Sequence, residues 1–88
     1  MPDTVTSLSI ADSRTYSISE LAREFGITPR ALRFYEDKDM LHPARDGMTR
    51  VYSHRDRGRV KIIVRLKRLG LPLADIREIL DLYGLEDG

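Results

Sequence analysis

The four residues Gly26-Ile27-Thr28-Pro29 constrain the fold of this chain more than any other stretch. Glycine readily ends a helix, and threonine followed by proline commonly begins another, because Thr caps free N–H groups and Pro fits the first helical position. Only Ile27 would then separate two helices, so the helices must cross steeply. This spacing predicts a helix-turn-helix.

The residues before the joint have the pattern of a short amphipathic helix. Ser17 and Glu20 form an S-x-x-E sequence, in which the serine caps the helix start and the glutamate reaches back to it. The apolar residues then recur at i, i+3, i+4 and i+7, at positions Ile18, Leu21, Ala22 and Phe25. Gly26 is expected to end this helix.

The second helix is expected over about residues 29–38. Its period places Leu32 and Tyr35 on an inner face, whereas Arg30 and Arg33 share the opposite, outer face. We expect the ring of Tyr35 to pack in the core while its hydroxyl reaches outward.

Residues 41–53 are predicted to form a small hairpin, or wing. Asp46-Gly47 is a turn signal, and the segment after it suits a short strand. Arg50 and Tyr52 alternate with Val51 in that strand, so the guanidinium and the phenol are expected to leave the same face.

Two further helices follow. Ser53, with Asp56 three residues later, can cap the first of them, and Gly58 should weaken it by roughly 1 kcal/mol relative to Ala. Its basic stripe comprises Arg57, Lys61, Arg65 and Arg68. Gly70 to Pro72 should end this helix. The last helix is predicted over about 73–83, with an apolar stripe of Leu73, Ile76, Ile79, Leu80 and Tyr83. The fold class is therefore mainly α, a winged helix-turn-helix of four helices with a small β-hairpin.

Composition limits the functions that such a domain can have. The 88 residues carry a net charge of only +1, but twelve basic and five acidic residues lie between Arg30 and Arg68, which favours a polyanionic partner. The chain has no cysteine and two histidines, so we expect no disulfide, metal or other cofactor. No apolar run is long enough to span a membrane, and the N-terminus lacks the pattern of a signal peptide. We therefore expect a cytoplasmic protein without a membrane partner. Residues 1–14 are expected to be a flexible arm.

The predicted surface suits double-stranded DNA. Arg30 and Arg33 could lie in the major groove, where Arg donates two hydrogen bonds to guanine or neutralises phosphate. Thr28 and the N–H groups at the helix start suit a phosphate. Arg50 and Tyr52, side by side, could hold neighbouring phosphates. Solvated surface is the alternative interpretation for the two helix arginines.

Catalysis is not predicted. Glu36, Asp37 and Asp39 lie close together in sequence, but general acid–base chemistry needs a concave pocket, which four short helices and a hairpin rarely supply. His42 precedes a proline in a loop and His54 lies at a helix start, where each suits a surface or capping position. We expect no enzymatic activity.

Three motifs in order, "TPRALRFYE", "RVYS" and "RLGLPLADIREIL", resemble the DNA-binding domain of the MerR family of bacterial transcription regulators. The resemblance covers about 16–83. It implies a winged helix-turn-helix that binds a palindromic promoter element as a homodimer and distorts an overlong promoter spacer so that RNA polymerase can engage both promoter elements. The sequence looks closest to the branch that regulates branched-chain amino acid and acyl-CoA catabolism.

The resemblance also implies DNA contacts from three places: the recognition helix, a first wing and a second wing between the last two helices. Carried over by motif, these positions are Arg30, Arg33 and Tyr35 in the helix, Arg45, Arg50 and Tyr52 in the first wing, and Lys67 in the second.

The sequence departs from the family pattern in three respects. Asp39 stands where the family usually has glycine, and the stretch from Gly47 to Arg50 is one residue longer than usual. We expect the domain over 15–84 and its C-terminal end over 85–88, with the family's dimerisation helix and effector domain absent. A fragment of a longer regulator is therefore favoured over a minimal protein that dimerises by other means.

Two other interpretations stay open. An architectural DNA-binding protein of the excisionase type shares the winged layout and bends DNA without controlling polymerase. A protein-interaction module could instead use the last helix and its acidic flank. Transcription with purified polymerase would distinguish the first alternative, and binding insensitive to charge reversal at Arg30 and Arg33 would favour the second.

Overall fold

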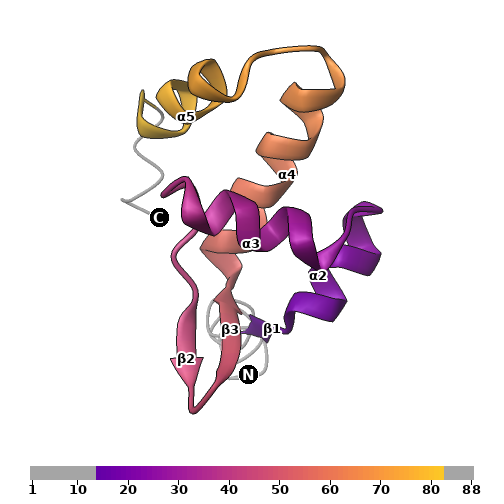
Figure 1. The fold of residues 1–88 in the computed structure, drawn as a ribbon, viewed down its shortest axis with the longest axis vertical. Helices are drawn as coiled ribbons and strands as arrows, with labels where there is room; N and C mark the ends of the chain where they lie inside the picture. Colours follow the sequence, from indigo (N-terminus) through magenta and orange to yellow (C-terminus); the bar gives the residue numbers. More distant parts are fainter. Residues whose placement is uncertain (1–13, 83–88) are drawn as a thin grey trace, which may run out of the picture.

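The computed structural model describes residues 14–82. Their elements, in order, are β1 (Thr15–Tyr16), α2 (Ile18–Phe25), α3 (Pro29–Asp37), β2 (Ala44–Asp46), β3 (Thr49–Ser53), α4 (His54–Arg68) and α5 (Leu73–Leu82). The predicted mainly α fold with four helices and a wing is confirmed (Figure 1). Nearly all of the expected N-terminal arm, as well as Tyr83 and residues 84–88, lies outside the described residues.

The helix-turn-helix begins and ends as its sequence predicts. The Ser17 hydroxyl accepts a hydrogen bond from the Glu20 N–H, and the Glu20 carboxylate accepts one from the Ser17 N–H. Gly26 follows α2 with a φ of 65°, a left-handed conformation that glycine adopts without steric penalty. Thr28 then caps α3 by accepting from the Ala31 N–H.

The far end of α3 also turns through a left-handed residue, but this residue is Asp39, with a φ of 65°. The Met40 N–H donates to the Tyr35 carbonyl and the Asp39 N–H to the Glu36 carbonyl, both at 2.9 Å. These two bonds define a Schellman motif, which usually has glycine at its left-handed position. The left-handed conformation costs an L-residue roughly 1–2 kcal/mol of free energy.

The wing lies in a three-stranded antiparallel sheet of order β1-β3-β2. Asp46 pairs with Thr49 across the turn, so Gly47 and Met48 form a two-residue loop, with a φ of 66° at Gly47. Positive φ at only the first central residue is the pattern of a type II′ hairpin turn. Strand β1 was not predicted, because two residues are too few for a periodic pattern.

The carboxylate of Asp56 joins the two ends of the wing. As the N3 residue of α4 it accepts from the Ser53 N–H through Oδ2 at 3.2 Å, and it accepts from the His42 N–H through Oδ1 at 3.4 Å. Ser53 completes the predicted capping box through its hydroxyl. The chain before β2 and the last residue of β3 are thereby bonded to one buried side chain.

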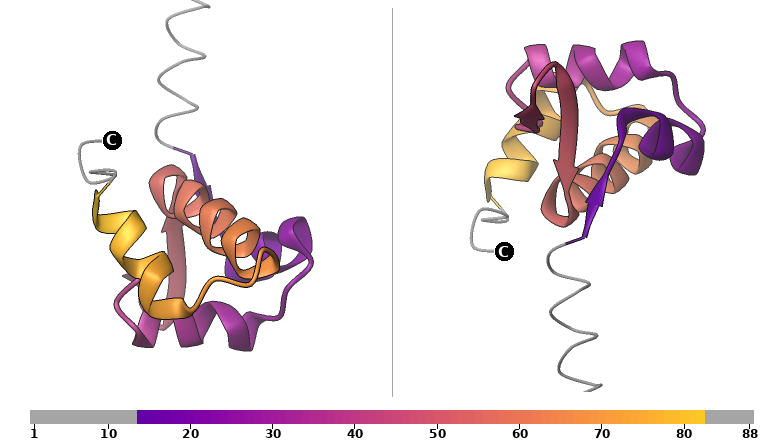
Figure 2. Two further views of the ribbon diagram at one scale, coloured as in Figure 1. Left: turned by 90° about the horizontal axis from the view of Figure 1, so that it is seen from above. Right: turned by 90° about the horizontal axis from the view of Figure 1, so that it is seen from below.

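The core lies where the helices meet the sheet. It comprises Tyr16, Leu21, Ala22, Leu32, Tyr35, Met40, Leu41, Tyr52, Val60, Ile63, Val64, Ile76 and Leu80. Helix α3 lies between the β2–β3 hairpin and the α4–α5 connection in Figure 1, and it follows the outer edge of the molecule in both views of Figure 2. Its outer face is therefore available to a partner.

Candidate nucleic-acid interface

The outer face of α3 carries the two arginines predicted to read DNA. Arg30 and Arg33 are exposed, and within residues 14–82 neither forms an ion pair with a carboxylate. Thr28, at the start of the same helix, is exposed as well. Tyr35 is buried as expected, and burial raises the pKa of its phenol. This face therefore presents two guanidinium groups that lack a carboxylate partner in the described part of the chain.

The wing brings three of the charged residues together, one residue pair away from its turn. The Arg50 Nε donates to Glu36 Oε1 at 2.7 Å, and the Arg45 Nη2 donates to Glu36 Oε2 at 3.2 Å. Arg45 and Arg50 are directly opposite each other in the hairpin register. Desolvation raises the pKa of Glu36, but the hydrogen bonds and charges of Arg50 and Arg45 outweigh it and lower the pKa overall. The carboxylate therefore stays ionised at neutral pH.

Tyr52 lies in a different setting from the one expected. The sequence predicted an exposed phenol beside Arg50, but the Tyr52 side chain is 0% exposed. Strand β3 is the middle strand of the sheet, and Tyr52 pairs there with Tyr16 beneath the helices. The buried Tyr52 hydroxyl has no hydrogen-bond partner among residues 14–82, and desolvation raises the pKa of this phenol.

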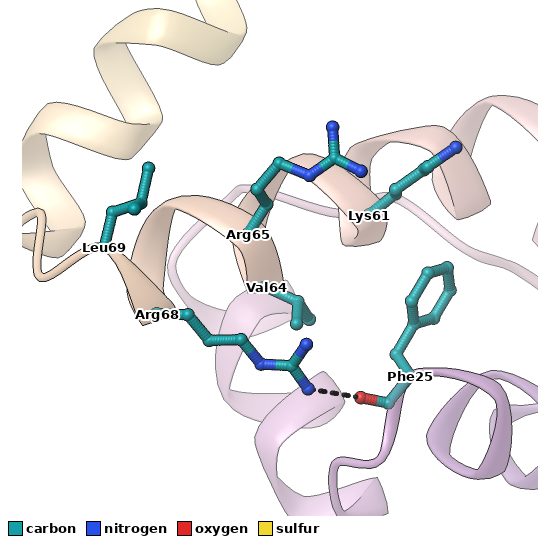
Figure 3. A pocket seen from close by; sticks show the side chains of 6 residues that line it. All are labelled: Phe25, Lys61, Val64, Arg65, Arg68 and Leu69. Carbon is teal, nitrogen blue, oxygen red and sulfur yellow. Dashed lines mark hydrogen bonds between the residues drawn. The ribbon is translucent and has the colours of Figure 1, made fainter.

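A second basic region lies at the C-terminal end of α4. Lys67, predicted for the second wing, is exposed in the last helical turn. Beside it is a hollow of about 340 Å³, lined by Phe25, Lys61, Val64, Arg65, Arg68 and Leu69 (Figure 3). The Arg68 Nη2 donates to the Phe25 carbonyl at 3.3 Å, next to the turn of the helix-turn-helix. The predicted basic stripe is thus split, because Arg57 pairs with Glu24 on α2 instead.

Sequence reasoning did not identify the partners of Glu36. It considered Glu36 together with the neighbouring acids of α3, whereas the side chain contacts Arg45 and Arg50, nine and fourteen residues away. No local pattern marks such a pair. The hollow beside α4 was missed for the same reason, since Phe25 lies on a helix far away in sequence.

Other kinds of site were sought in the same part of the chain. Among residues 14–82, no group of three His, Asp or Glu side chains could hold a metal ion. No helix in this range is long and apolar enough to cross a membrane.

The domain is a winged helix-turn-helix of the nucleic-acid-binding class. It has the helix-turn-helix, the adjacent hairpin wing and basic groups on both flanks of the second helix. Residues 16–82 match the sequence model of the family described as MerR HTH family regulatory protein. The chain belongs to the MerR family.

Curated relatives agree with this assignment. The HTH-type transcriptional regulator ZntR of Escherichia coli K12 is 39% identical over 69 residues, which are 76% of this chain and 49% of ZntR. The regulator CueR of Bacillus subtilis 168 is 37% identical over 73 residues, which are 82% of this chain and 51% of CueR. The chain thus spans about half the length of these relatives.

Solved structures share the fold. HiNmlR, a MerR family regulator lacking the sensor domain and bound to promoter DNA, superposes with a TM-score of 0.71 at 28% identity, covering 80% of this chain and 55% of HiNmlR. A MerR family regulator from Bacillus cereus gives a TM-score of 0.69 at 32% identity, covering 76% of this chain and 52% of that protein.

Proposed function

We propose that this domain binds double-stranded promoter DNA sequence-specifically and regulates transcription by distorting the promoter spacer. The observation that carries the proposal is the outer face of α3, where Arg30 and Arg33 are exposed and lack carboxylate partners among the described residues. Guanidinium groups placed in this way can reach base edges in a major groove. Membership of the MerR family and the DNA complex of the relative HiNmlR support this function.

Arg30 and Arg33 would read bases, while the start of α3 would fix the register. Thr28 and the helix N-terminus can bind one phosphate, because the first N–H groups of a helix and its dipole favour an anion. Tyr35 would approach the backbone through its hydroxyl, because its ring is held in the core.

The two wings would hold the flanking phosphates. Arg45 and Arg50 supply guanidinium donors at the first wing, and Lys67 supplies an ammonium group at the second. A contact from the Tyr52 hydroxyl to a phosphate oxygen would require this side chain to become accessible on DNA binding, because it is fully buried and lacks a partner among the described residues. Contacts of this kind position a protein on DNA without reading its sequence.

The wider proposal concerns a longer protein. It would act in the cytoplasm as a homodimer on two half-sites, together with RNA polymerase, and without enzymatic chemistry or a cofactor in this domain. Regulation of branched-chain amino acid and acyl-CoA catabolism is the narrower form of the proposal. Selection of bound duplexes from a random pool would test it, because the selected sequence should occur in promoters of such genes.

The variant Arg33→Ala tests base reading. On the selected duplex it should weaken binding by at least about tenfold, whereas on a scrambled duplex the loss should be about threefold or less. Arg77→Ala serves as the control, because it removes the same charge from α5, where the 3.6 Å contact of Arg77 with Asp39 is long and exposed. Equal losses of Arg33→Ala on both duplexes would exclude a base-reading role.

Transcription with purified RNA polymerase tests regulation separately from binding. A promoter that carries the selected sequence in an overlong spacer should respond to the protein, and the same promoter with a scrambled spacer should not. Tight binding with unchanged transcription would instead identify an architectural DNA-binding protein.

A further inference from the structure

We propose that Glu36 is a positioning residue for DNA recognition, which sets where the wing grips phosphates relative to the helix that reads bases. This inference rests on the proposed function. The inference goes beyond that function, because it assigns a role in sequence specificity to an acidic side chain. A carboxylate is itself repelled by DNA.

The first step of the argument is how Glu36 is bonded. Each of its two oxygens accepts from a different strand of the hairpin: Oε1 from Arg50 of β3 at 2.7 Å, and Oε2 from Arg45 of β2 at 3.2 Å. Because Arg45 and Arg50 are opposite each other in register, one carboxylate spans the width of the wing. It therefore restrains the direction of the hairpin as well as its distance from α3.

The second step is that Glu36 supplies the polar link between the wing and this helix. Within residues 14–82, these two bonds are the hydrogen bonds that join α3 to β2 or β3. Glu36 lies in the last turn of α3, one helical turn after Arg33 on the outer face. The same rigid helix thus carries the base-reading arginine and the wing's anchor.

The third step is that both arginines stay available to DNA while Glu36 holds them. A guanidinium has five N–H donors, and Glu36 engages Nε of Arg50 and Nη2 of Arg45, so each group keeps donors for phosphate. The side chains of Glu36 and Arg50 are 22% and 23% exposed, and that of Arg45 is 47% exposed. The trio carries two positive charges and one negative charge, so it still attracts a phosphate.

These features predict opposite effects on two kinds of binding. Removing the negative charge of Glu36 should strengthen attraction to any duplex, since one repulsive charge is lost. Loss of the two hydrogen bonds to Glu36 should weaken only the sequence-specific complexes. In those complexes the wing and α3 must contact DNA in one fixed relative position. Specificity should fall while non-specific affinity rises.

The decisive experiment compares Glu36→Gln with Asp37→Asn on the selected and scrambled duplexes. Asp37 is the next residue of α3, is exposed, and has no ion pair with the wing. Both variants should bind the scrambled duplex about twofold tighter. Only Glu36→Gln should lower the ratio of specific to non-specific affinity, by about tenfold.

A second variant separates charge from position. Glu36→Asp keeps the charge but shortens the side chain by one methylene, so it cannot span both arginines. It should lower the specificity ratio without the gain on scrambled DNA. Thermal unfolding of each variant confirms that the domain is folded during the measurement.

The outcomes distinguish the two proposals. Failure of the wild-type protein to prefer its selected duplex would overturn the proposed function itself. A wild-type preference that Glu36→Gln retains would overturn only the positioning role. Tighter binding of Glu36→Gln to both duplexes in equal proportion would instead show that Glu36 merely withholds the arginines from DNA.

Discussion

The two flanks of α3 are both basic, but their cations are held differently. At the wing, Arg45 and Arg50 are hydrogen-bonded to one carboxylate. Along the second half of α4, Lys61 and Arg65 have no ion pair among residues 14–82, and Arg68 bonds only to a backbone carbonyl. Flanks with similar charge therefore differ in how strongly they fix position.

This difference distinguishes two contributions to DNA binding, positioning of the phosphates and general electrostatic attraction. A count of charges does not distinguish them. A guanidinium held by a charge-assisted hydrogen bond keeps its direction, and it can place a phosphate relative to the bases. A long cation without a partner samples many positions and contributes attraction that salt screens. We expect the wing to set register and the α4 flank to set general affinity.

The largest expected effect comes from removing one arginine on each flank. Arg50→Ala should weaken binding to the selected duplex about thirtyfold, because a phosphate contact is lost and Glu36 keeps only Arg45. Arg65→Ala should cost about threefold on any duplex and make the salt dependence shallower. Titrations at several salt concentrations measure both effects. Equal losses, with equal changes in salt dependence, would remove the distinction between the flanks.

A smaller effect is expected at Tyr52, behind the wing. Tyr52→Phe removes a buried hydroxyl that has no partner in the described part of the chain, so the free energy of unfolding should rise by about 1 kcal/mol. If the hydroxyl binds phosphate in the complex, affinity for the selected duplex should fall about threefold. Urea unfolding and duplex titration measure the two quantities. Higher stability with unchanged affinity would exclude Tyr52 as a phosphate ligand.

The smallest effect concerns Asp39, three residues after Glu36, whose side-chain contacts are long. Its contacts with His42 and Arg77 are both 3.6 Å long and highly exposed, so they contribute little. Asp39→Gly should raise the free energy of unfolding by up to about 1 kcal/mol, because glycine adopts the left-handed conformation without strain.

Asp39→Asn is the matched variant, since it removes the charge but keeps a side chain at the left-handed position. It should change stability by less than Asp39→Gly does. A destabilised Asp39→Gly protein would mean that the two long contacts of Asp39 outweigh the backbone strain, and that Asp39 holds its partners as firmly as Glu36 does.

The features that the sequence predicted well are those encoded within a few residues. Ser17, Gly26 and Thr28 set the ends of α2 and α3, because capping and left-handed turns depend on side chains beside the backbone they satisfy. The burial of Leu32 followed in the same way from helical period. These signals sufficed for the fold class.

Features that depend on distant partners were not predictable. Arg57 appeared as part of a basic stripe, but Glu24, 33 residues earlier, pairs with it. Tyr52 was placed on the correct strand, but its burial depends on β1. The sequence has no periodic pattern that predicts the pairing of β1 with β3. The DNA contacts of all the site residues stay predictions, to be decided by the titrations above.

The double attachment of Asp56 has a consequence for local motion. Because His42 and Ser53 are bonded to the same carboxylate, the hairpin is a loop closed at its base. Breaking those bonds releases both ends together, so β2 and β3 should open as one cooperative unit rather than fray strand by strand. In hydrogen exchange, the amides of the two strands should therefore share one opening free energy, and Asp56→Ala should lower it for both.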